Sequence, residues 1–110
     1  MNDVGAEVDG SGGSIGPASE VVTAIEALGG RAVVNGDDIS TDDGAKRLID
    51  TAVEAFGGLD ILVQNAGIYP WTLIENIEPD EWDAVLGVNL RGTFLAAQAA
   101  LPAMRTRGGG

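Results

Sequence analysis

Segments with helical periodicity alternate with short apolar runs along this chain, and this alternation most restricts its fold. The clearest helical pattern covers 40–56, where apolar residues recur three and four positions apart: Ala45, Leu48, Ile49, Ala52, Val53 and Phe56. Ser40 is suited to cap the beginning of this helix, and Gly57 with Gly58 predicts its end. The apolar run 59–64 follows directly and predicts a strand covered on both faces.

The remaining segments extend the same alternation. Residues 17–28 carry a helical apolar stripe, 31–35 predict a short strand, and 1–4 predict the end of another strand. A third helix is expected from about Glu78 to about Leu101, where Pro102 would kink or end it. The strand ends are thus spaced by roughly 30 residues, as in a βαβ unit. The sequence therefore predicts an α/β fold with a doubly wound parallel sheet, in one domain over 1–110.

Composition excludes several classes of site and partner. The chain has no histidine and no cysteine, which excludes disulfides, Cys/His zinc sites, thiol nucleophiles and a Ser-His-Asp triad within it. Its net charge of −11 argues against nucleic acid and anionic membranes as partners. No apolar signal segment is visible, and uncharged stretches such as 92–104 are shorter than the about 20 residues of a transmembrane helix. We expect a cytoplasmic location.

Polar residues at the predicted strand ends form the candidate site. Ligands bind outside the carboxyl ends of parallel strands, so Asp3, Asp38 and Asn65 are expected to share one rim. Asn89 falls within an apolar helical stripe made of Trp82, Val85, Leu86, Leu90 and Phe94. It is therefore expected to be buried or nearly so, where it costs stability unless its hydrogen bonds are met. The alternative to a functional role is a structural asparagine that ties the helix to a neighbouring backbone.

These motifs resemble the short-chain dehydrogenase/reductase family. The resemblance rests on Asn65-Ala66-Gly67 directly after a predicted strand and on the segment WDAVLGVNLRGTF at 82–94. Shorter matches in the same order, at 2–5, 29–33, 37–40 and 55–57, extend it over the whole chain. It implies a Rossmann-like fold that is incomplete here, hydride transfer between a nicotinamide cofactor and a secondary alcohol or ketone, and a homo-oligomer when the protein is intact.

The resemblance also implies roles for individual residues. Asp3 would bind the adenosine ribose, Asp38 and Ile39 would line the adenine pocket, and the backbone of Asn65, Ala66 and Gly67 would lie along the cofactor. Asn89 matches the asparagine of the family's catalytic set, where it holds a water on a proton relay. A carboxylate at Asp3 accepts both ribose hydroxyls and repels a 2′-phosphate, so NAD is expected rather than NADP.

The sequence also departs from the family pattern. The glycine-rich phosphate loop has no counterpart, the single tyrosine, Tyr69, precedes Leu73 where the Tyr-x-x-x-Lys element needs lysine, and the single lysine is Lys46. The chain thus resembles the middle of the fold, and we expect it to be inactive alone. The alternative is a non-catalytic nucleotide-binding or oligomerisation piece of the same fold.

Two further patterns each have two interpretations. The glycine-rich stretch 10–19 is either a phosphate cradle or a surface connection, and its glycines do not fit the dinucleotide-binding spacing. The acids Asp37, Asp38, Asp42 and Asp43 either bind Mg²⁺ or Ca²⁺ or cap the following helix. Ile49 stands where a calcium loop beginning at Asp38 requires glutamate, which favours capping.

Overall fold

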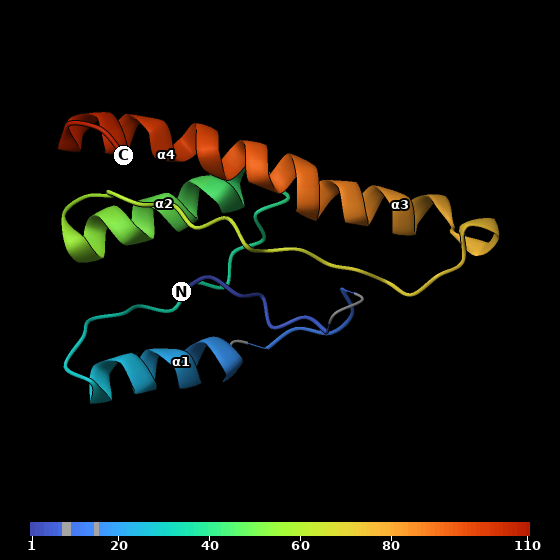
Figure 1. Cartoon of the computed structure of the whole chain (residues 1–110), viewed down its shortest axis with the longest axis horizontal. Helices are drawn as coiled ribbons and strands as arrows, with labels where there is room; N and C mark the ends of the chain where they lie inside the picture. The colour runs from blue at the N-terminus through green and yellow to red at the C-terminus, as the bar shows by residue number, and fades with distance from the viewer. Residues whose placement is uncertain (8–9, 15) are drawn as a thin grey trace.

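Helices form most of the ordered secondary structure of this chain. The computed structural model describes residues 1–7, 10–14 and 16–110. Its elements are α1 (Gly16–Ala27), α2 (Asp42–Phe56), the 3-10 turn η1 (Ile74–Asn76), α3 (Pro79–Leu86), the π-helical segment η2 (Gly87–Gly92) and α4 (Thr93–Arg107). Figure 1 shows α3, η2 and α4 continuing as one long rod beside α2, with α1 on the opposite side of the extended N-terminal segments.

Local capping explains the bounds of α2. The Thr41 hydroxyl accepts a hydrogen bond from the Gly44 N–H at 3.1 Å, so Thr41 is the N-cap. The prediction of Ser40 was wrong by one residue, because the Ser40 N–H bonds instead to the Asp38 carboxylate at 2.9 Å in a tight turn. Gly57 ends the helix in the left-handed region, at φ 81°, as its place in the sequence predicts.

The third predicted helix is longer and less regular than expected. Pro102 lies inside α4 and does not end it, because a proline removes only one helical hydrogen bond and the neighbouring turns continue. The helix ends instead at Gly108, with φ 101°. The π-helical segment η2 interrupts the run where Asn89 lies, and hydrophobic periodicity did not predict this interruption.

The helical run Pro79–Arg107 has 29 residues and a mean hydropathy of 1.2 in its most apolar window. By length and composition alone it is therefore long and apolar enough to cross a membrane. This is weak evidence, because a helix that packs on the core of a soluble protein passes the same test. Contacts with α2 cover part of its apolar surface.

The predicted parallel sheet is not seen in this chain. No strand forms among residues 1–7, 10–14 and 16–110, and one isolated parallel bridge joins Asn2 to Asn35. The backbone of the run 59–64 makes no hydrogen bond with another described segment, and its side chains Ile61 and Val63 are 77% and 80% exposed. A segment becomes a strand only when its backbone pairs with that of a second segment, and none of the described residues pairs with 59–64 in this way.

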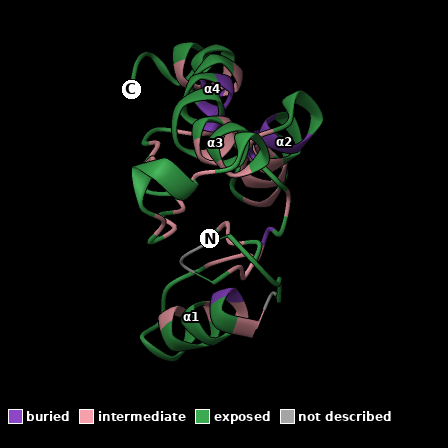
Figure 2. Cartoon of the chain, turned by 90° about the vertical axis from the view of Figure 1, so that its right-hand side faces the viewer, coloured by how far each residue is buried: buried purple, intermediate pink, exposed green. Residues whose placement is uncertain are grey.

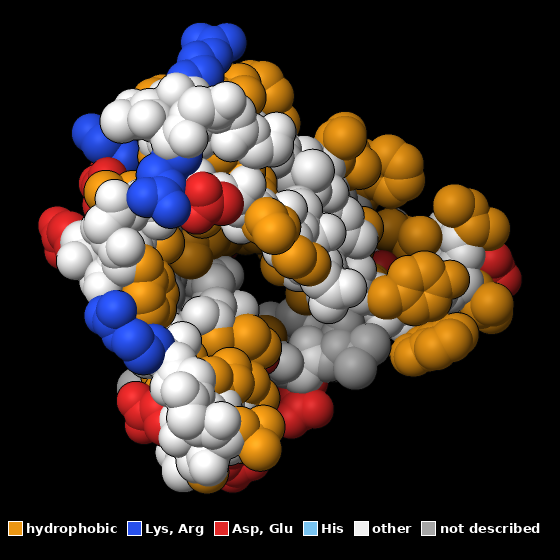
Figure 3. All heavy atoms as spheres, turned by 60° about the vertical axis from the view of Figure 1, so that its left-hand side comes forward, with side chains coloured by type: hydrophobic (Ala, Val, Ile, Leu, Met, Phe, Trp, Pro, Cys, Tyr) orange, Lys and Arg blue, Asp and Glu red, His pale blue; other side chains and the backbone are white. Residues whose placement is uncertain are grey.

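The core lies between α2 and α4. Ala45 and Ile49 of α2 are buried there with Leu95, Ala96 and Ala100 of α4. Figure 2 shows the buried residues gathered in this region and only one buried turn in α1. Many large apolar side chains elsewhere stay exposed, and Figure 3 shows hydrophobic patches on the surface around a hollow near the centre of that view. This packing holds α2 and α4 firmly and leaves the apolar stripe of α1 largely uncovered.

Candidate functional site

Asp3 is held next to the second predicted strand through its backbone. Its N–H donates to the Asn35 carbonyl at 3.1 Å, and the Asn35 N–H donates to the Met1 carbonyl at 2.9 Å. One oxygen of the Asp3 carboxylate accepts from the Gly5 N–H at 2.7 Å. Gly5 has a φ of 67°, a conformation that glycine adopts without strain. The carboxylate therefore sits at a turn where the first extended segment ends.

Asp38 and Ile39 lie at the end of the second extended segment and differ in exposure. Asp38 is exposed and its carboxylate accepts from the Ser40 N–H. Ile39 is only 5% exposed. Its side chain packs against Gly92, where an added Cβ would come within 3.1 Å of the Ile39 Cδ1 atom. Ile39 is thus in contact with η2, the segment that carries Asn89.

Asn89 clamps the loop that follows the third extended segment. Its Oδ1 atom accepts from the Ile68 N–H at 2.9 Å, and its Nδ2 atom donates to the Ile68 carbonyl at 3.0 Å. The prediction that Asn89 is buried was wrong, because the apolar stripe around it is uncovered: Trp82, Leu90 and Phe94 are 53%, 66% and 59% exposed. Its two hydrogen bonds with Ile68 are the tie to a neighbouring backbone that the structural alternative for Asn89 requires.

The Asn65-Ala66-Gly67 segment is exposed and leads into this clamp. No hydrogen bond within the described part of the chain uses its backbone groups, so they are open to a ligand. A Cβ at Gly67 would come within 3.3 Å of the Asn89 Oδ1 atom, so a side chain there would press on the clamp. The side-chain nitrogen of the preceding Gln64 is buried, without a partner among the described residues, and an acceptor outside this chain would relieve that cost.

These contacts connect the predicted site residues into two groups. The segments that carry Asp3 and Asp38 lie side by side. The Asn2–Asn35 bridge joins them, and the Asn2 side chain donates to the Asp37 carbonyl at 3.0 Å. Gly67 and Asn89 meet at the clamp. Contact between Ile39 and Gly92 links the two groups, whereas no hydrogen bond within the described residues joins Asn65 to either acid.

The sequence analysis missed the polar residues beneath Asp3 and Asp38. Asn35 is 8% exposed, and its Nδ2 atom donates to Asp37 Oδ2 at 2.7 Å and to the Thr51 hydroxyl at 3.1 Å. Arg47 donates to Asp37 Oδ1 at 2.6 Å. The available signal was an asparagine at the end of a β-branched run, where a buried amide needs partners.

The acidic cluster is a capping and ion-pairing feature. The Arg47 guanidinium and the Asn35 amide hold the pKa of Asp37 below its usual range, with Arg47 the larger cause. Asp42 and Asp43 lie in the first turn of α2, where carboxylates are favourable. Within the described ranges no three acidic side chains group in a way that would hold a metal ion.

The glycine-rich stretch 10–19 includes Ile15, which is outside the described residues.

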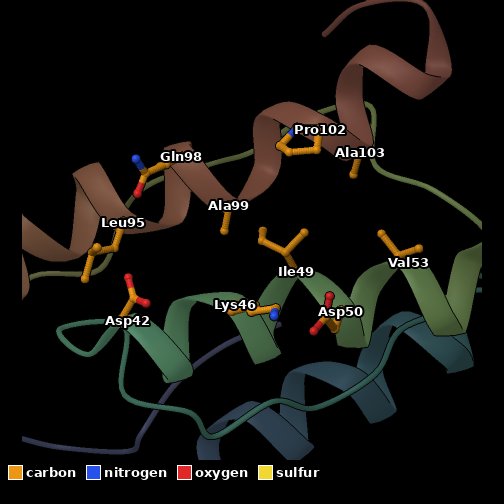
Figure 4. Close-up of a pocket in the computed structure, with 10 residues that line it drawn as sticks. All are labelled: Asp42, Lys46, Ile49, Asp50, Val53, Leu95, Gln98, Ala99, Pro102 and Ala103. Carbon is orange, nitrogen blue, oxygen red and sulfur yellow. The ribbon is translucent and has the colours of Figure 1, made fainter.

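A groove lies elsewhere, between α2 and α4. It has a volume of about 470 Å³, and Figure 4 shows Ile49 and Val53 of α2 facing Leu95, Ala99 and Pro102 of α4. Lys46, Asp50 and Gln98 add polar groups at its edges. None of the predicted site residues lines it. The candidate site is therefore an exposed rim and not a closed cavity.

This chain is similar to known proteins over nearly its whole length. The family model described as short chain dehydrogenase matches residues 3–110. A peroxisomal hydratase-dehydrogenase-epimerase of Neurospora crassa is 39% identical over 105 residues, which cover 96% of this chain and 11% of that protein.

Two solved structures match as well. The crystal structure of a short chain dehydrogenase from Mycobacterium avium has a TM-score of 0.80 and 44% identity, covering 99% of this chain and 40% of that one. A short chain dehydrogenase from Burkholderia cenocepacia in complex with NADP has a TM-score of 0.74 and 43% identity, covering 78% and 35%. This chain thus spans less than half the length of these relatives, and they imply a Rossmann-like fold. The match over nearly every residue, with the Asn65-Ala66-Gly67 segment and Asn89 in contact at the rim, shows that the chain belongs to the short-chain dehydrogenase family of oxidoreductases.

Proposed function

We propose that this chain supplies the adenosine side of a nicotinamide site and one member of the catalytic set in an enzyme that interconverts secondary alcohols and ketones. The observation that carries the proposal is a set of contacts: the Asp3 backbone bonds to Asn35, the Asn35 side chain bonds to Asp37, and Ile39 packs against Gly92 of η2, the segment that carries Asn89. The hydrogen bonds between Asn89 and Ile68 add the loop that follows 65–67. The finer parts of the proposal, NAD over NADP and the alcohol or ketone substrate, rest on that resemblance and on the chemistry of Asp3.

The residues present fit the adenosine half of such a cofactor. A carboxylate accepts hydrogen bonds only, and the two hydroxyls of a ribose donate them. Asp3 has one oxygen engaged by the Gly5 N–H, and a carboxylate retains several further lone pairs. The exposed Asn65-Ala66-Gly67 backbone offers unbonded N–H and C=O groups, which suits a ligand lying along it. A 2′-phosphate near Asp3 would meet negative charge, which favours NAD.

Asn89 has two roles in this proposal. Its side chain fixes the backbone of Ile68 and thereby the end of the loop at 65–67. Its own carbonyl accepts from the Thr93 hydroxyl at 2.8 Å within the π-helical turn. Bound NAD would supply the hydride acceptor, and an acid/base tyrosine would act from outside the motifs of this chain. Asn89 would support that proton transfer from a position that its hydrogen bonds with Ile68 and Thr93 help to fix.

Nucleotide binding and turnover together test the proposal. We expect the full-length gene product to bind NAD more tightly than NADP and to form NADH from some members of a panel of secondary alcohols. Asp3→Asn should weaken NAD binding by about tenfold or more, as expected for the loss of a hydrogen bond to a charged group. Glu7→Gln is the matched control, because it removes the same charge from an exposed residue of the same segment.

Three results would decide between the proposal and its alternatives. Equal NAD affinities of the Asp3→Asn and Glu7→Gln variants would remove Asp3 from the site. NAD binding without turnover of any alcohol or ketone would support the non-catalytic nucleotide-binding piece. Preference for NADP over NAD would contradict the proposed cofactor but not the membership of the chain in the family.

A further inference from the structure

A polar network centred on the buried Asn35 joins α2 to the segments 1–4 and 31–37, next to the candidate nucleotide site. Its members are Asn2 and Asn35, whose backbones form the parallel bridge, Asp37, and Arg47 and Thr51 of α2. These five residues are called the rim network below. The family resemblance assigned none of them a role.

Asn35 is the centre of the rim network, and every hydrogen-bonding group it has is used. Its Oδ1 atom accepts from Asn2 Nδ2 at 2.7 Å and from the Asp37 N–H at 3.0 Å. Its Nδ2 atom donates to Asp37 and to Thr51. Its backbone carbonyl accepts from the Asp3 N–H, and its N–H donates to Met1. A fully satisfied buried amide specifies one arrangement of its neighbours, because any other would leave a donor or acceptor unpaired.

The two candidate nucleotide acids are each one residue away from a network member. Asp3 follows Asn2, and Asp38 follows Asp37. The Asn2 side chain donates to the Asp37 carbonyl at 3.0 Å, so the residues that precede the two acids are bonded to each other directly. Among the described residues, the position of Asp3 relative to Asp38 is therefore set by this network together with the parallel bridge between Asn2 and Asn35.

Arg47 and Thr51 anchor the network to α2. They are separated by one helical turn and so share a face of the helix. The Thr51 hydroxyl donates to the Arg47 carbonyl at 2.7 Å and accepts from Asn35, while Arg47 holds the outer oxygen of Asp37. Because α2 packs on α4, the network fixes Asp37 and Asn35 relative to the packed core between these two helices.

We infer that the rim network positions Asp3 and Asp38 for the adenosine half of the nucleotide, and that Arg47 is a positioning residue for nucleotide affinity although it lies on a helix behind the site. The inference rests on the proposed function. Arg47 contacts Asp37 and not the expected ligand, so its effect on affinity must pass through the network. A supporting residue of this kind keeps binding groups in place and lowers the cost of ordering them on binding.

The test compares two arginines that each make one ion pair. Arg47 pairs with Asp37, and Arg107 pairs with Asp60 at 3.1 Å on the far end of α4; the arginine side chains are 59% and 49% exposed. Arg47→Ala and Arg107→Ala thus remove the same side chain, the same charge and one ion pair. The dissociation constants of ADP-ribose and NAD and the melting temperature are measured for both variants of the full-length gene product.

Arg47→Ala should weaken ADP-ribose and NAD binding by about three- to tenfold, a size typical of coupling within one hydrogen-bonded network. Arg107→Ala should stay within about twofold of the parent, because distant sites act independently. At saturating NAD, kcat of the Arg47→Ala variant should equal that of the parent, which separates positioning of the nucleotide from a general loss of folded enzyme. Arg47→Lys, which keeps the charge, should recover part of the affinity.

Asn2→Ala in combination with Arg47→Ala tests whether the residues act as one unit. If they do, the double variant binds ADP-ribose only slightly more weakly than the worse single variant. Parent-like affinity of the Arg47→Ala variant, or equal losses in both arginine variants, would overturn the inference and leave the proposed function intact. A parent protein that binds neither ADP-ribose nor NAD would overturn both.

Discussion

Replacing Asn89 by alanine separates its two proposed roles, because it removes one amide that makes two hydrogen bonds with the Ile68 backbone. Oδ1 accepts from the Ile68 N–H at 2.9 Å and Nδ2 donates to the Ile68 carbonyl at 3.0 Å. Each such bond contributes about 0.5–1.5 kcal/mol net, and an exposed site lets water replace the lost partner. We therefore expect a loss of about 1 kcal/mol, or a Tm lower by about 4–8 °C for a domain of this size.

The effect on catalysis distinguishes the relay from the clamp. If Asn89 supports proton transfer, kcat of the full-length gene product falls by about 10²-fold or more while the NAD dissociation constant changes little. If it serves only as the clamp on Ile68, kcat of the folded variant stays near the parental value and only the Tm falls. Both constants are measured on one preparation, below the melting temperature of the variant.

Gln98→Ala is the matched control for this experiment. Gln98 is exposed on the same helical run, and its side chain makes no hydrogen bond to another described residue. Its loss should change neither kcat nor Tm by a measurable amount. An Asn89→Ala variant that melts with the parent would refute the clamp, and one that melts earlier yet turns over at the parental rate would refute the relay.

Three other predictions concern stability and activity. Thr41→Ala removes the cap on the Gly44 N–H and should cost about 1 kcal/mol; thermal denaturation beside Thr23→Ala, whose hydroxyl caps no helix, measures this loss. Arg47 lowers the pKa of Asp37 below its ordinary 3.8, so this ion pair stabilises the fold above that pH and its contribution disappears as the pH falls through the lowered value. Acid denaturation should therefore be less steep in Asp37→Asn, and an identical acid transition would contradict the assignment. The 110-residue chain alone should form no NADH from NAD and secondary alcohols, because it has no Tyr-x-x-x-Lys element; NADH formation that scales with chain concentration would refute this.

Helices and their ends were predictable from the sequence because their signals are local. The expected helix at 17–28 corresponds to α1 at Gly16–Ala27, and the one at 40–56 to α2 at Asp42–Phe56. Apolar spacing, a hydroxyl cap and a following glycine all act within one or two turns. The capping error at Ser40 is of the same local kind, since two adjacent hydroxyl residues compete for one position.

The rim network and the strands were not predictable in the same way. Asn2 and Asn35 are 33 residues apart, and nothing in the periodicity of either segment shows that their side chains will meet. The structure does bring together the segments that carry Asp3 and Asp38, as the sequence predicted. Strand formation at 59–64 failed because it requires a neighbouring segment, which an apolar run cannot supply for itself.

Exposure of Asn89 has the same physical cause as exposure of the stripe around it, and this gives a last prediction. Spacing correctly placed Asn89 among Trp82, Leu90 and Phe94, but burial also needs a second surface, and the described residues provide none for this face. If another part of the full-length gene product or a second copy covers the stripe, water can no longer replace the lost hydrogen bonds, and Asn89→Ala then costs up to about 3 kcal/mol. The rate of amide hydrogen exchange at Ile68 measures the loss of this hydrogen bond, and it is compared between the 110-residue chain and the full-length gene product. We expect the substitution to accelerate exchange at Ile68 more in the full-length product, whereas equal acceleration in both would show that the stripe stays in contact with water.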